Sequence, residues 1–161
     1  MSKTLIVYYS LEGNSEYAAA ALAEFIEGET DTEHIVPVTE PPKEGFGKFL
    51  RGGKSVVFGE TPALEELTFK PEEYDNIVFV FPIWAGSYPP AVATYIKDHP
   101  VTGKKLYAVA CSGGGKGQKA VEKLAAKLPG CTLVSSLNLI EPLKNKDKTA
   151  EHVKAFAAQI K

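Results

Sequence analysis

Cysteine, histidine and long apolar runs are all scarce in this chain of 161 residues. Two cysteines, Cys111 and Cys131, are too few for the disulfide framework of a small secreted domain, so we expect two reduced thiols. The three histidines are scattered singly without metal-ligand spacing, which argues against a metal site. The apolar run at residues 5–9 is too short for a signal peptide or a membrane span. We therefore expect a cytoplasmic protein that does not contact a membrane.

An excess of charge of either sign is also lacking, because 18 basic and 20 acidic side chains leave a net charge of −2. That balance provides no argument for a nucleic-acid partner, which would require a basic face. The hydrophobic content of 44% is sufficient for a core. The length predicts a single domain over residues 1–161.

Short apolar runs alternate with helical patterns along the chain. The runs predict strands at residues 5–9, 34–38, 77–81, 106–110 and 131–140. Residues 34–38 would form an edge strand, because Pro37 cannot donate a ladder hydrogen bond. Apolar residues at three- and four-residue spacing predict helices after Asn14, after Pro90, near residues 120–128 and near 153–160. This order predicts an α/β fold, a three-layer doubly wound five-stranded parallel sheet.

One long stretch, residues 39–69, has little periodicity and carries several glycines around Phe46, Phe49 and Arg51. It lies where a helix between the second and third strands would be expected. Irregular segments of this length in a compact domain are often functional.

The loop that follows the first strand contains Ser10, Leu11, Glu12, Gly13, Asn14 and Ser15. Ligands of open α/β sheets bind at the carboxyl ends of the strands, and a helix N-terminus there favours an anion. Gly13 permits a tight turn, and the short polar side chains can donate to phosphate oxygens. The loop matches neither the dinucleotide-binding nor the nucleotide triphosphatase motif. The alternative is that Asn14 and Ser15 simply cap the helix.

Two further loops follow predicted strands. Residues 82–88 carry the single tryptophan, Trp84, which is placed to stack on a flat ring or, alternatively, to fill the core. Residues 111–115 contain three glycines that expose backbone N–H groups to a ligand, or form a plain flexible turn. A phosphate cradle, an aromatic platform and a glycine-rich edge together indicate a flat heterocycle with one phosphate, as in FMN.

The segments YYSLEGNS, DNIVFVFPIWAGSYPPAV and ACSGGGKG resemble the flavodoxin family over essentially the whole chain. The resemblance implies the strand order 2-1-3-4-5, for which flavodoxin is the standard example. It implies FMN, with the phosphate on residues 10–15. The flavin ring would then contact Pro82, Ile83, Trp84, Ala85, Gly86, Ser112, Gly113, Gly114 and Gly115.

The implied activity is electron transfer with two redox partner proteins, a reductase and an acceptor, by a monomer or homodimer. The alternative is an FMN-dependent NAD(P)H oxidoreductase of quinones or similar small acceptors, with Tyr88 and residues 45–59 around a second ligand.

Two features depart from the family. The family often has a hydroxyl residue where this chain has Glu12, so we expect that carboxylate to point to solvent. Electron carriers are often strongly acidic, and this chain is nearly neutral. No catalytic side chain is recognisable.

Overall fold

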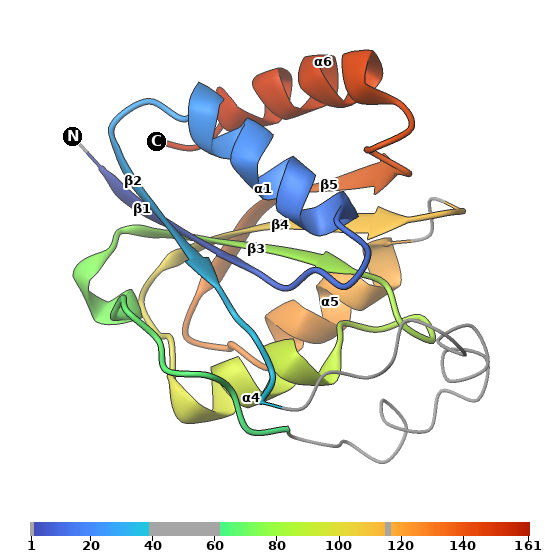
Figure 1. Cartoon of the computed structure of the whole chain (residues 1–161). Coiled ribbons are helices and arrows are strands. Elements are labelled where there is room, and N and C mark those ends of the chain that lie inside the picture. Colours follow the sequence, from blue (N-terminus) through green and yellow to red (C-terminus); the bar gives the residue numbers. More distant parts are fainter. Residues whose placement is uncertain (1, 39–61, 115–116) are drawn as a thin grey trace.

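The computed structural model describes residues 2–38, 62–114 and 117–161 (Figure 1). Its strands pair in parallel in the order β2-β1-β3-β4-β5, which confirms the predicted fold class and strand order. Their bounds are β1 (Lys3–Tyr8), β2 (Glu29–His34), β3 (Asn76–Pro82), β4 (Lys105–Ser112) and β5 (Thr132–Ile140). None of the described helices is long and apolar enough to cross a membrane.

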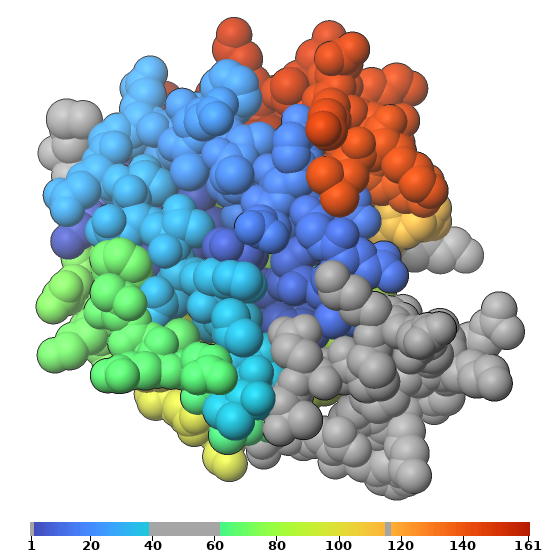
Figure 2. All heavy atoms as spheres, in the orientation of Figure 1, coloured from blue at the N-terminus to red at the C-terminus, as the bar shows by residue number. Residues whose placement is uncertain are grey.

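Helices cover both faces of the sheet, as three layers require. The helices α1 (Asn14–Phe25) and α6 (Lys146–Ala157) lie on one face. The helices α4 (Pro90–Asp98) and α5 (Gln118–Ala126) lie on the other. In the space-filling view, α6 packs directly against α1 (Figure 2).

The core is divided in two by the sheet. Successive side chains of a strand point to opposite faces, so Phe79 joins the cluster under α4 and α5, whereas Val78 and Val80 join the cluster under α1 and α6. Burial on both faces explains why β3 is a continuous apolar run with no polar alternation.

The predicted second strand, residues 34–38, is wrong. The strand is Glu29–His34, paired with β1 from Lys3↔Glu29 to Tyr8↔His34. Its sequence, ETDTEH, is polar because it forms an edge of the sheet, so it lacks the apolar pattern on which the prediction depended. Pro37 instead forms an isolated antiparallel bridge with Leu64.

Residues 62–69 join this edge to the short 3-10 helix η1 (Pro71–Glu73), and they are irregular, as predicted. They are nevertheless tied to the sheet edge by hydrogen bonds. The carboxylate of Glu33 accepts from the backbone N–H groups of Thr68, at 2.6 Å, and Phe69, at 3.3 Å. The Val38 N–H donates to the Ala63 carbonyl at 2.8 Å. Predictions for Phe46, Phe49, Arg51 and the rest of 39–61 lie outside the described residues.

Candidate functional site

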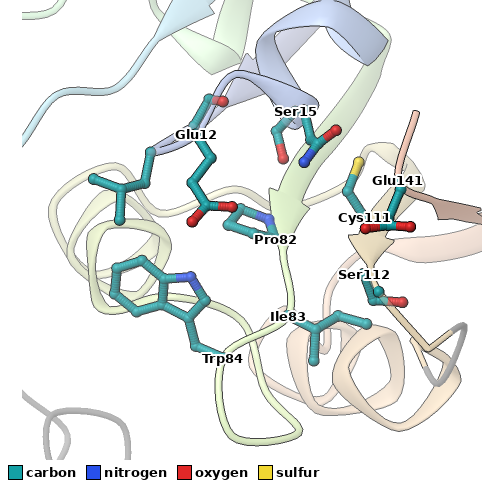
Figure 3. A pocket seen from close by; sticks show the side chains of 12 residues that line it. Glu12, Ser15, Pro82, Ile83, Trp84, Cys111, Ser112 and Glu141 are labelled. Carbon is teal, nitrogen blue, oxygen red and sulfur yellow. The ribbon is translucent and has the colours of Figure 1, made fainter. Parts of the chain in front are cut away.

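A cavity of about 220 Å³ opens at the carboxyl edge of the sheet, where β1 and β3 send their following helices to opposite faces (Figure 3). This is the position at which open α/β sheets bind ligands. The residues that line it are Ser10, Leu11, Glu12, Asn14, Ser15, Pro82, Ile83, Trp84, Cys111, Ser112, Gly113 and Glu141.

The three loops selected from the sequence therefore meet around one cavity. Four residues of the predicted set lie in these loops but do not line the cavity: Gly13, Ala85, Gly86 and Gly114. Gly115 lies outside the described residues.

Gly13 shapes the loop between β1 and α1. Its φ of 99° is in the left-handed region, and a Cβ there would lie 3.3 Å from Leu143 Cδ1. Its N–H donates to Ser10 Oγ at 3.1 Å, and its carbonyl accepts from Tyr17 N to begin the helix. The predicted tight turn is thus present and requires glycine.

Neither polar side chain at the start of α1 caps the helix, so that alternative is wrong. Asn14 Oδ1 accepts from the Leu143 N–H at 3.1 Å, in the loop after β5. Ser15 is 1% exposed, and its Oγ forms no hydrogen bond within the described part of the chain. A buried hydroxyl without a partner is costly, and this one lies in the wall of the cavity.

Cys111 lies beside Ser15 in the cavity wall, whereas the sequence placed it at the start of the third loop without selecting it as a binding residue. Burial raises the pKa of its thiol to about 12, and the nearby Ser15 hydroxyl opposes that rise. The thiol is therefore protonated at neutral pH and is a poor nucleophile. Both cysteines are free, as the sequence predicted.

Trp84 begins a tight turn in the loop after β3. The backbones of Trp84 and Ser87 exchange two hydrogen bonds of 2.9 Å. Ala85 and Gly86 both have positive φ, 49° and 73°, as a type I′ turn requires. The indole is 4% exposed and packs edge-on against Tyr9, with ring centroids 5.5 Å apart. It belongs to the core, as the alternative predicted, and it also lines the cavity, where stacking on a ring stays a prediction.

Two carboxylates line the cavity. Glu12 is exposed to solvent and its side chain also lines the cavity, on the side of Pro82 in Figure 3, so its direction relative to a phosphate stays a prediction. Glu141 follows β5 with a positive φ of 42°, and its N–H donates to the Ser112 carbonyl at 3.0 Å. No lysine or arginine is among the described residues that line the cavity.

The family model described as Flavodoxin matches residues 3–157. The chain belongs to the flavodoxin family. No curated protein is significantly similar to its sequence.

Solved structures with the same flavodoxin-like fold cover nearly the whole chain. A putative flavoprotein from Bacteroides uniformis ATCC 8492 is 26% identical, with TM-score 0.78, over 98% of each chain. A flavoprotein from Lactobacillus acidophilus NCFM, in complex with FMN, is 17% identical, with TM-score 0.71, over 91% of this chain and 98% of the other. An azoreductase from Bacillus anthracis str. Sterne is 16% identical, with TM-score 0.54, over 99% and 96%.

Sequence reasoning missed Glu141 as well as Cys111. Glu141 follows the fifth strand of this flavodoxin-family sheet, so the rule that selected the other loops would also have selected it. The loop after β5 has no cluster of glycines or aromatic residues to mark it. Its contacts with Asn14 and Ser112 are visible only once the chain is folded.

Proposed function

We propose that the chain binds FMN in this cavity and carries electrons between a reductase and an acceptor protein. Its membership of the flavodoxin family and the FMN complex among the similar structures support the choice of cofactor. The observation that carries the assignment to the cavity is Ser15, whose buried hydroxyl has no hydrogen-bond partner within the described residues.

The residues at the start of α1 suit the phosphate of FMN. The first N–H groups of a helix have no intrahelical partner, and the helix dipole favours an anion there. Ser15 Oγ can donate to a phosphate oxygen that reaches the cavity floor. Gly13 leaves the backbone open, since it presents no side chain.

The other two loops suit the flavin ring. Pro82, Ile83 and Trp84 offer apolar surface, and Ser112 with Gly113 offers polar atoms to the same cavity. We assign Ala85, Gly86, Gly114 and Gly115 to the same loops. When bound, the flavin supplies the redox chemistry, while the chain binds and orients it and limits access of water.

The proposal of a carrier over an NAD(P)H oxidoreductase is supported by the charges at the cavity. Hydride transfer from a nicotinamide needs a second binding surface, with cations for the phosphates of the dinucleotide. The described lining residues offer two carboxylates and no cation. The basic residues Lys43, Lys48, Arg51 and Lys54 lie outside the described residues.

Titration of FMN into the apoprotein tests the cofactor assignment. Trp84 is the single tryptophan, so its fluorescence should be quenched as the cavity fills. Unquenched emission at saturating FMN would show that the flavin ring does not lie against Trp84. Failure to bind FMN at all would reject the proposal.

Stopped-flow mixing tests the role. The FMN-loaded protein should lose its visible absorbance slowly with NADH or NADPH and much faster when a flavodoxin reductase is added. Rapid bleaching by free nucleotide alone would favour the oxidoreductase. A charge-reversed variant of Lys48 and Arg51 should change the salt dependence of the partner reaction and leave FMN affinity unchanged.

A further inference from the structure

The cavity presents an electrostatic problem for a phosphorylated ligand. The phosphate group is anionic at neutral pH, and the carboxylates of Glu12 and Glu141 both line the wall. Like charges in a partly enclosed site repel one another more strongly than in water. Hydrogen bonds from Ser15 and the start of α1 would have to overcome both repulsions unless a cation lies nearby.

Lys144 provides such a cation next to Glu141, although it is not itself a lining residue. Its Nζ lies 2.9 Å from Glu141 Oε1, in an ion pair whose side chains are 75% and 41% exposed. The hydrogen bond and the charge of Glu141 raise the pKa of Lys144, and the charge of Glu12 adds to that rise. The ammonium is therefore within electrostatic reach of both carboxylates.

The loop that carries Lys144 is fixed against the cavity. The carbonyl of Glu141 accepts from the N–H groups of Lys144, at 2.9 Å, and Asn145, at 3.2 Å. The Glu141 N–H is bound to Ser112, and Leu143 donates to Asn14 Oδ1. The loop after β5 thus joins two walls of the cavity, and Lys144 lies next to Leu143 in that loop.

We propose that Lys144, held by Glu141, is the countercharge for the phosphate of the flavin, and that it makes the site prefer FMN over the uncharged riboflavin. This inference rests on the proposed function. It assigns binding selectivity to the loop after β5, outside the three loops that the sequence indicated. Glu141 has two opposite effects, since it holds the ammonium near the cavity but also competes with the phosphate for it.

The test compares FMN with riboflavin on the apoprotein by calorimetric or fluorescence titration. Lys144→Gln should weaken FMN binding at low salt by about two- to fivefold, as expected for loss of one exposed charge contact. Riboflavin binding should change less than about twofold, because it carries no phosphate, and the FMN effect should shrink as salt screens the charge.

Matched variants complete the test. Lys144→Arg should retain the preference for FMN. Lys97→Gln makes the same change in net charge at the last turn of α4, far from the cavity, and should leave both affinities unchanged. Glu141→Gln should strengthen FMN binding, because it removes a repulsion and releases the ammonium. Thermal unfolding verifies that every variant is folded.

The outcomes separate the two proposals. Equal effects of Lys144→Gln on both ligands, or no effect on either, would overturn the role of Lys144 while FMN binding stands. Equal effects of Lys97→Gln and Lys144→Gln on FMN affinity would also overturn it, because the loss would then follow from net charge alone and not from the position of Lys144. A wild-type protein that binds neither flavin would reject the proposed function and this inference together.

Discussion

Gly13 combines a positive φ with a close neighbour, so it should be the least replaceable residue of the β1–α1 loop. Gly13→Val should lower FMN affinity by at least about tenfold, since a left-handed L-residue costs about 1–2 kcal/mol and the new side chain would press on Leu143. Titration of FMN into the variant measures this. Gly103→Val is the control, because Gly103 also has a positive φ, 71°, but a Cβ there would have no neighbour within 4 Å. Near-normal FMN affinity of Gly13→Val would contradict the role of this turn.

The two cysteines should differ sharply in reactivity. The thiolate is the reacting form, and a pKa of about 12 leaves about one Cys111 in 10⁴ ionised at pH 8. Cys131 is only partly buried, and its Sγ donates to the Val101 carbonyl at 3.4 Å. Alkylation followed by mass spectrometry should modify Cys131 first, and a Cys131→Ser variant should react very slowly. Preferential modification of Cys111 in the folded protein would contradict its burial.

Helix α5 packs very closely on the sheet at Gly117, the residue before its first turn. A Cβ at Gly117 would overlap the Asn138 side chain and lie 2.7 Å from Ala110 Cβ. Gly117→Ala should therefore destabilise the protein by about 1–3 kcal/mol through overpacking. Denaturant unfolding should show a lower midpoint with an unchanged slope. Gly114→Ala should be nearly neutral, because a Cβ at Gly114 would have no other atom within 4 Å, and equal effects of the two substitutions would contradict this account.

The strands β1 and β3 were predicted well because both are strongly buried. The apolar runs of β1 and β3 are covered on both faces, so composition alone located them. The polar edge strand β2 was misplaced because its stability comes from backbone pairing with β1 and not from apolar side chains. The candidate site was also predicted in part. The ends of the predicted strands indicated three of its loops, whereas the position of Glu141 beside Ser112 depends on how β4 and β5 pair.

Across the whole molecule, burial affects most of the tyrosines. It raises the pKa of Tyr8, Tyr74, Tyr88, Tyr95 and Tyr107, and nearby carboxylates add to the effect at Tyr8, Tyr74 and Tyr95. A pKa that is higher in the folded than in the unfolded state gives stability that is complete below pH 10 and is lost as the pH rises further.

Alkaline titration, followed by tyrosinate absorbance, measures this effect. In the native protein, most tyrosines should ionise above their ordinary value of about 10, and the free energy of unfolding should fall over the same range. In denaturant, all of them should ionise near about 10. A native titration curve that coincides with the denatured one would contradict the burial of these hydroxyls.

The chain leaves the sheet edge after Val38 and is back beside it at Ala63, where the two backbones share a hydrogen bond of 2.8 Å. Thr94 Oγ1 fixes the returning end by donating to the Pro62 carbonyl at 2.7 Å. Because the entry and exit of residues 39–61 are adjacent, a short linker can join them, and loop-closure cost changes slowly with length. We therefore expect that a linker between Val38 and Pro62 could take the place of that stretch, while the hydrogen bonds that hold its two ends to the sheet edge and to α4 remain.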